Sequence, residues 1–204
     1  LLNTLEDLKD STNYALAQHS YPTRTLEEVR CFVGNGIRKL IDRAVPEGTS
    51  VEKTDKVFAT FREYYATHSR VKTSMYEGME QVMDALKEQN ISMAIVSNKA
   101  DDAVKDLAKY YFAKYIDVAI GEREGISRKP APDSVYEAMR LLGATKENTV
   151  YVGDSDVDRA TAKNAGIPCI SVTWGFRSEE LLVSLKPEYL IHKPEEILSV
   201  VTGK

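Results

Sequence analysis

The sequence predicts an α/β fold, in which a Rossmann-like parallel sheet follows a helical domain. Two observations support this prediction. From about residue 76 onwards, short apolar runs of strand length alternate with helical segments, which is typical of a parallel sheet covered by helices on both faces. Before residue 76, the apolar residues recur at helical spacing. A length of 204 residues fits one large domain or a domain with a sizeable insertion.

The N-terminal part is predicted to be helical throughout. Apolar spacing predicts a first helix within residues 2–16, and the Tyr21–Pro22 pair ends that segment. The stretch TLEE at 25–28 is a capping-box pattern that opens a second helix, and GNG at 34–36 breaks it. The helix resumes over 37–45. A further helix has one apolar face, formed by Val57, Phe58, Phe61, Tyr64 and Tyr65.

The C-terminal part is predicted to alternate between helices and strands. The expected helices cover residues 77–89, 101–112, 131–143, 158–166, 178–185 and 194–201. The expected strands cover residues 91–97, 115–121, 149–153, 168–174 and 188–191. In such sheets ligands bind beyond the carboxyl ends of the strands. Ser97 and Asp154 each follow a predicted strand at such an end.

Composition argues against several classes of function. The net charge is only −4 and the basic residues are spread along the chain, which argues against nucleic acid or an anionic membrane as the main partner. No apolar run approaches the roughly 20 residues needed to cross a bilayer. Cys31 and Cys169 lack metal or redox spacing, so we expect a reducing, cytoplasmic location. The three scattered histidines argue against a zinc site.

Three carboxylates, Asp154, Asp156 and Asp158, crowd together after a predicted strand. A calcium loop would need Gly and Glu where Arg159 and Ala165 stand, so that interpretation fails. An esterase G-x-S-x-G elbow fails as well, because its final position is not Gly. Two interpretations remain. The aspartates bind a hard cation such as Mg²⁺, or they cap a helix that starts near Asp158.

Other polar residues have both a functional and a structural interpretation. Ser97 and Asn98 follow a buried strand and precede a helix, which suits a phosphate cradle but also an ordinary turn. Prolines after Lys129 fix the backbone, so its ammonium could stabilise negative charge; a lone lysine before proline is otherwise solvated surface. Gly36 and Arg38 lie at a helix break, where they could face substrate or serve the fold alone.

The order of these motifs resembles the haloacid dehalogenase superfamily of phosphatases. VSNK at 96–99 resembles its second motif, RKPAPD at 128–133 its third, and GDSDVD at 153–158 its fourth. By this resemblance, residues 7–75 are an inserted helical cap and residues 76–204 the α/β core, with 1–6 a remnant of that core. FVGNGIRKLIDRA at 32–44 and VTWGFRS at 172–178 are similar to phosphoglycolate phosphatases in particular.

The resemblance implies an Mg²⁺-dependent phosphatase that acts on a small phosphorylated metabolite through an aspartyl-phosphate. Ser97 and the Asn98 amide would hold the phosphoryl oxygens, with Gly36 and Arg38 as further substrate-binding candidates. Lys129 would bridge nucleophile and phosphate. Asp154 would be an Mg²⁺ ligand and Asp158 would support the metal directly or through water. Asp156 would occupy a variable position of the motif.

The sequence departs from the family pattern at its start. The family's first motif, D-x-D-G-T at the end of a strand, should precede LLNTLEDL, and residue 1 is not Met. We expect the natural protein to carry this segment, since it supplies the attacking aspartate. Without it, the sheet should lack a central strand and leave the edges of its neighbours unpaired. The residues given should then bind phosphate and Mg²⁺ weakly without turnover.

Three functional alternatives remain open at this stage. The substrate could be pyrophosphate or a sugar phosphate instead of phosphoglycolate. In a different class, the protein could be a catalytically silent binder of a phosphorylated metabolite. The sequence makes no prediction of oligomeric state.

Overall fold

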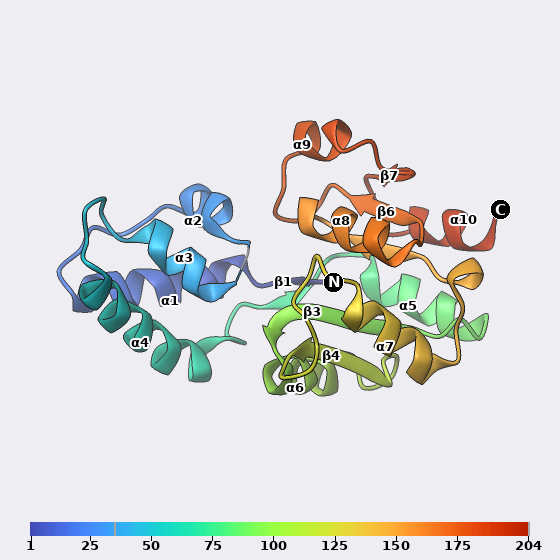
Figure 1. Cartoon of the computed structure of the whole chain (residues 1–204), viewed down its shortest axis with the longest axis horizontal. Coiled ribbons are helices and arrows are strands. Elements are labelled where there is room, and N and C mark those ends of the chain that lie inside the picture. Colours follow the sequence, from blue (N-terminus) through green and yellow to red (C-terminus); the bar gives the residue numbers. More distant parts are fainter. Residues whose placement is uncertain (35, 204) are drawn as a thin grey trace. The chain divides into compact units, whose positions relative to one another are not determined.

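The structure is a computed structural model that describes residues 1–34 and 36–203. The chain divides into two units, Leu1–Tyr76 and Glu77–Lys204 (Figure 1). The assignment of residues 1–6, 7–75 and 76–204 to a core remnant, a cap and a core stays a prediction. None of the described helices combines the length and apolar character needed to cross a membrane.

The first unit is built from helices and one short strand pair. Its elements are β1 (Leu2–Asn3), α1 (Leu5–Gln18), α2 (Leu26–Phe32), α3 (Ile37–Ala44), α4 (Val51–His68) and β2 (Ser74–Met75). Helix α1 packs along α4, and Leu16 and Phe61 are fully buried there. The predicted capping box is present, because Thr25 and Glu28 exchange side-chain to backbone hydrogen bonds at the start of α2.

Two details of this unit differ from the sequence-based expectation. Leu2 does not belong to the first helix; it pairs with Met75 in the antiparallel β1–β2 ladder, and α1 begins at Leu5. Phe58 and Tyr64 are only partly buried. The buried face of α4 is therefore narrower than predicted. The Tyr64 ring instead stacks on Tyr14, with the ring centroids 3.9 Å apart.

A buried carboxylate fastens the start of α1 to the segment before β2. Asp7 is 2% exposed and accepts hydrogen bonds from the backbone N–H groups of Lys72 and Thr73 and from the Thr73 hydroxyl. These donors satisfy a charge whose burial would otherwise be costly.

The second unit alternates helix and strand, as predicted. Its strands are β3 (Ala94–Ala100), β4 (Val118–Glu122), β5 (Tyr151–Gly153), β6 (Cys169–Val172) and β7 (Tyr189–Ile191). Its helices are α5 (Met79–Glu88), α6 (Asp101–Tyr111), α7 (Asp133–Leu142), α8 (Asp156–Ala165), α9 (Glu179–Ser184) and α10 (Glu196–Thr202), with a 3₁₀ turn at Lys146–Asn148. Helices α6 and α7 pack on β3 and β4, while α8 packs on β5 and β6. Figure 1 shows the same arrangement, which confirms the α/β prediction.

All strand pairs of this unit are parallel, but the described strands form two separate sheets. One sheet is β3–β4 and the other has the order β5–β6–β7. Within residues 1–34 and 36–203, β3 and β5 therefore each have a partner on one side only. The predicted interruption of the sheet is thus present among the described strands.

Candidate active site

Lys129 lies between the two sheets, in the connection from β4 to α7. Its ammonium Nζ is 2.8 Å from Asp158 Oδ1, 2.9 Å from the Tyr151 hydroxyl and 3.3 Å from the Val96 carbonyl oxygen. Val96 belongs to β3 and Tyr151 to β5. The side chain is only 12% exposed, so Lys129 is not a solvated surface lysine. The structure brings together the third and fourth sequence motifs at this cation.

The end of β3 holds the backbone of Lys129. The Asn98 side chain accepts a hydrogen bond from the Lys129 N–H (2.8 Å) and donates one to the Lys129 carbonyl (3.1 Å). Ser97 Oγ accepts from the Lys99 N–H, and the β3–β4 register shifts between Val96 and Ala100. The backbone therefore leaves the regular ladder where these polar residues stand. That Ser97 and Asn98 bind phosphate stays a prediction; the positioning of Lys129 by the Asn98 side chain was not foreseen.

Asp158 is the buried counter-charge of Lys129. It is 7% exposed; besides Lys129, it accepts hydrogen bonds from the Tyr151 hydroxyl (3.0 Å) and from Ser155 Oγ (2.6 Å). Burial would raise the pKa of Asp158, but the Lys129 ammonium and these donors hold that pKa below its usual value. Burial, with the charge of Asp158, raises the pKa of Tyr151 well above its usual value. Both pKa shifts favour a negatively charged Asp158 and a neutral Tyr151 that donates its hydroxyl to it.

Ser155 explains the start of α8. Its hydroxyl accepts from the Asp158 N–H, so Ser155 is the N-cap and the helix begins at Asp156. The predicted helix is therefore present with aspartates at its N-terminus, but its N-cap is Ser155 and not an aspartate. Asp158 instead lies in the first turn, where its negative charge suits the helix dipole.

Asp154 is held by a loop that follows β6. Its Oδ2 accepts a hydrogen bond from the Phe176 N–H at 2.8 Å. A Cβ atom on Gly175 would lie 2.0 Å from the same oxygen, so only glycine fits there. Burial and the nearby charge of Asp158 raise the pKa of Asp154. A bound cation would oppose both effects.

Comparison with known proteins identifies the family. The haloacid dehalogenase-like hydrolase family matches residues 1–172. The chain belongs to this family. The prediction made from the motifs is confirmed, and with it the prediction that the protein is an enzyme.

Solved structures and curated relatives agree with this assignment. The structure of a candidate phosphoglycolate phosphatase from Lactobacillus delbrueckii subsp. bulgaricus is 31% identical, with a TM-score of 0.93 over 100% of this chain and 94% of that one. Phosphoglycolate phosphatase 1 of Pseudomonas aeruginosa is 29% identical over 97% of this chain and 75% of its own length. Pyrophosphatase PpaX of Listeria monocytogenes serotype 4a is 29% identical over 98% and 91%.

The aspartates of this hydrolase have different partners. Asp158 pairs with Lys129, and Asp156 accepts a hydrogen bond from Arg177 Nε at 2.9 Å. Asp154 forms no side-chain ion pair with the described residues. No group of three or more His, Cys, Asp or Glu suited to a metal occurs in the described chain. Mg²⁺, however, needs only one or two protein carboxylates when water and substrate phosphate supply the rest. The residues present fit such a cation, with Asp154 as the available carboxylate.

Two predicted substrate residues of this hydrolase, Gly36 and Arg38, belong to the first unit. Gly36 precedes α3 with φ of 90°, while Asn35 lies outside the described residues. The Arg38 guanidinium hydrogen-bonds to Asp42 Oδ1 (2.7 Å) and to Asp55 within the same unit. Arg38 therefore has a structural role, and its contact with substrate stays a prediction.

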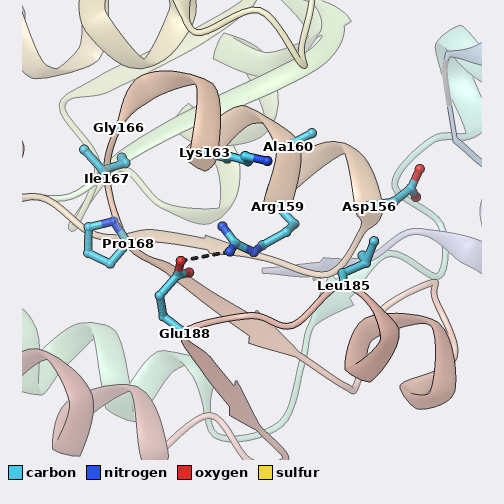
Figure 2. A pocket seen from close by; sticks show the side chains of 9 residues that line it. All are labelled: Asp156, Arg159, Ala160, Lys163, Gly166, Ile167, Pro168, Leu185 and Glu188. Carbon is cyan, nitrogen blue, oxygen red and sulfur yellow. Dashed lines mark hydrogen bonds and ion pairs between the residues drawn. The ribbon is translucent and has the colours of Figure 1, made fainter.

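A pocket of about 670 Å³ lies along α8 (Figure 2). It is lined by Asp156 and by residues further along the helix and beyond it, but not by Ser97, Lys129, Asp154 or Asp158. Arg159 crosses it to reach Glu188, with Nη2 and Oε1 2.8 Å apart. The charges that line it are thus partly paired with one another, and the pocket is separate from the Lys129 cluster.

Sequence reasoning missed Tyr151 and the backbone of the 174–177 loop. A tyrosine in an otherwise apolar strand is a usable signal, because its hydroxyl needs a partner when buried. The stretch VTWGFRS was noticed for its resemblance to phosphoglycolate phosphatases, but nothing local to it indicates Asp154 as its partner.

Proposed function

We propose that this hydrolase is an Mg²⁺-dependent phosphatase of small phosphomonoesters, with 2-phosphoglycolate as the first candidate substrate. The observation that carries the proposal is the buried Lys129 ammonium, which Asp158, Tyr151 and Val96 hold in place. A second carboxylate of the same motif as Asp158, Asp154, has no ion-pair partner among the described side chains. A fixed cation beside a candidate metal ligand suits a phosphoryl group, whose transfer depends on positioning and charge stabilisation.

The residues of the chain have distinct roles in this proposal. Lys129 stabilises negative charge on the phosphoryl oxygens, and Asn98 fixes the Lys129 backbone. Ser97 donates its hydroxyl to a phosphoryl oxygen. Asp154 would hold Mg²⁺ with support from Asp158, and the metal would neutralise and orient the phosphate. Because Asp158 is committed to Lys129, Tyr151 and Ser155, it would support a bound cation indirectly and would not be a ligand itself.

The proposed reaction runs through an aspartyl-phosphate. A carboxylate attacks phosphorus, the alcohol leaves, and water then hydrolyses the acyl phosphate. By family resemblance, the attacking aspartate belongs to a D-x-D-G-T motif, which residues 1–204 do not contain. The interruption between β3 and β5, beside Lys129, supports a strand carrying this motif at that place.

Pyrophosphate is the second candidate substrate. Relatives named pyrophosphatase PpaX match this chain about as well as those named phosphoglycolate phosphatase do; PpaX of Listeria monocytogenes serotype 4a and phosphoglycolate phosphatase 1 of Pseudomonas aeruginosa are both 29% identical to it. Residues outside the Lys129 cluster must decide between the two substrates, because Lys129, Asp154 and Asp158 act on the phosphoryl group that both have in common.

A phosphate-release assay on the product of the complete reading frame tests the proposal. The panel contains 2-phosphoglycolate, pyrophosphate and a hexose phosphate, each with Mg²⁺ and with chelator. We expect the highest kcat/KM on 2-phosphoglycolate, loss of activity with chelator, and loss in Asp154→Asn. A highest kcat/KM on pyrophosphate would favour the second candidate. Calorimetric binding of a phosphometabolite without any turnover would contradict a phosphatase and favour the silent binder.

A further inference from the structure

Among the described residues, several contacts join the connection between β6 and β7 to the α8 region, and three of them matter here. The Phe176 N–H donates to Asp154, Arg177 pairs with Asp156, and Glu188 pairs with Arg159. The first two contacts lie at the loop 174–177, which follows β6 directly. The third lies on the far side of α9, beside the pocket in Figure 2.

The loop 174–177 approaches Asp154 unusually closely. The backbone at Gly175 passes so near the carboxylate that a Cβ atom there would meet Oδ2 at 2.0 Å and the Asp154 Cβ at 2.2 Å. Real Cβ atoms do not tolerate such distances, so the loop and the carboxylate fit together only with glycine. Phe176, the next residue, donates its N–H to that same Oδ2.

Arg177 keeps the loop in this place. Its side chain is only 16% exposed, and its Nε donates to Asp156 Oδ1 at 2.9 Å. This contact also neutralises Asp156, just as Lys129 neutralises Asp158. Of the three clustered carboxylates, Asp154 alone forms no ion pair with a described lysine or arginine side chain, and Phe176 holds it by a backbone N–H.

We propose that the loop 174–177 is a positioning element for the cation site. The Phe176 N–H holds Asp154 Oδ2, which leaves the other carboxylate oxygen for a divalent cation. Arg177 keeps the loop in place through its ion pair with Asp156. This inference rests on the proposed function, in which Asp154 is the metal ligand. Gly175 and Arg177 are positioning residues, since they act through Asp154 and Asp156. Partners that orient a metal ligand typically change metal affinity about 10- to 100-fold when they are removed.

The chain offers a matched control for Arg177. The Arg159–Glu188 pair also fastens the connection to α8, with a distance of 2.8 Å against 2.9 Å for Arg177–Asp156. The exposed fractions of the side chains are 16% and 42%, against 16% and 43%. Arg159→Ala and Arg177→Ala therefore remove ion pairs of the same kind. Only Arg177 lies next to the residue that holds Asp154.

Binding of Mn²⁺, measured by electron paramagnetic resonance, tests the proposal without relying on activity. The protein is the product of the complete reading frame, compared with Arg177→Ala, Arg159→Ala, Gly175→Ala and Asp154→Asn. We expect the Mn²⁺ Kd to rise about 10-fold in Arg177→Ala and at least as much in Gly175→Ala. Arg159→Ala should stay within about twofold of the wild type, although both arginine variants lower the thermal midpoint similarly. Arg177→Lys should restore part of the affinity.

The outcomes separate this inference from the proposed function. Equal Kd values for Arg177→Ala and Arg159→Ala, with loss of binding in Asp154→Asn, would overturn the positioning role and leave the metal ligand in place. Wild-type affinity in Asp154→Asn would overturn the assignment of Asp154 as metal ligand, and the loop's role with it. If Gly175→Ala fails to fold, the comparison of the two arginine variants still decides.

Discussion

Strands β3 and β6 have similar sequences but different surroundings. Each contains a short run of small and β-branched apolar residues with one serine, AIVS at 94–97 and CISV at 169–172. Strand β6 lies between β5 and β7, and each of its residues is at most 5% exposed. Strand β3 pairs only with β4 among the described strands, and none of its residues is fully buried. The number of neighbouring strands, and not hydrophobicity alone, determines burial.

The two strands also contribute differently to the protein, since β6 contributes to the core and β3 to the candidate site. Strand β6 contributes its side chains to the core, and Cys169 packs in a cluster with Val135, Met139 and Tyr151. Strand β3 contributes polar groups at its end instead: the Val96 carbonyl accepts from Lys129, and Asn98 holds the Lys129 backbone. Among the described residues, the end of β3 therefore serves mainly to hold Lys129.

The largest expected contrast is in stability. Ile170→Ala in β6 removes a fully buried side chain and should lower the free energy of unfolding by about 2–5 kcal/mol. In a protein of residues 1–204, Ile95→Ala in β3 removes a partly exposed side chain and should cost about 1 kcal/mol. Urea unfolding followed by fluorescence of Trp174, the single tryptophan, reports on this unit directly. Equal costs would show that β3 is as well packed as β6.

Thiol reactivity should test the burial of β6 independently, with Cys31 of α2 as the exposed reference. Burial raises the pKa of Cys169 in β6 to about 12, whereas Cys31 is exposed. Since the thiolate is the nucleophile, iodoacetamide at pH 8 should modify Cys31 and leave Cys169 unmodified in the native protein. Peptide mass spectrometry measures both sites, and the same reaction in urea is the control in which both are labelled. Rapid native labelling of Cys169 would mean that β6 opens readily.

The smallest expected effect concerns the link between β3 and β4. Asp101 follows β3 and accepts a hydrogen bond from the Gly121 N–H of β4 at 2.8 Å, while pairing with Lys105. Lys105 and these contacts lower the pKa of Asp101 below its usual 3.8. A lowered folded-state pKa stabilises the fold above pH 3.8, and that contribution is lost as the pH falls through the folded-state pKa.

Asp101→Asn should therefore be less stable than the wild type at pH 7, and the gap should narrow below pH 4. Urea midpoints at pH 7 and pH 3 measure it. A gap of constant size would mean that the charge of Asp101 contributes nothing to the β3–β4 link.

Local signals in the sequence predicted much of the fold. The alternation of apolar strands with helices gave the order of elements in the second unit, because each element depends mainly on its own residues. The Thr25–Glu28 capping box was likewise predictable from four neighbouring residues. Lys129, Asp154 and Asp158 were predicted as site residues by motif order, and the structure gathers Lys129 and Asp158 into one ion pair.

The contacts between distant residues were not predictable. Asn98 and Lys129 are 31 positions apart, and Asp154 and Phe176 are 22 apart. No local pattern specifies such pairs, because they arise only when the strand ends meet. The one-sided pairing of β3 was predicted, but from the resemblance to the family and not from any pattern local to the strand.

The central claim is that Lys129, fixed between β3 and β5, stabilises the charge of a phosphoryl group. Phosphate release by Lys129→Met, on the best substrate of the panel, tests it most directly. Lys163→Met, which changes a lysine lining the pocket beside α8, is the control, and Trp174 fluorescence verifies folding. We predict that kcat/KM falls by about 10²–10³ in Lys129→Met and by no more than about twofold in Lys163→Met. A folded Lys129→Met variant with wild-type kcat/KM would contradict the account.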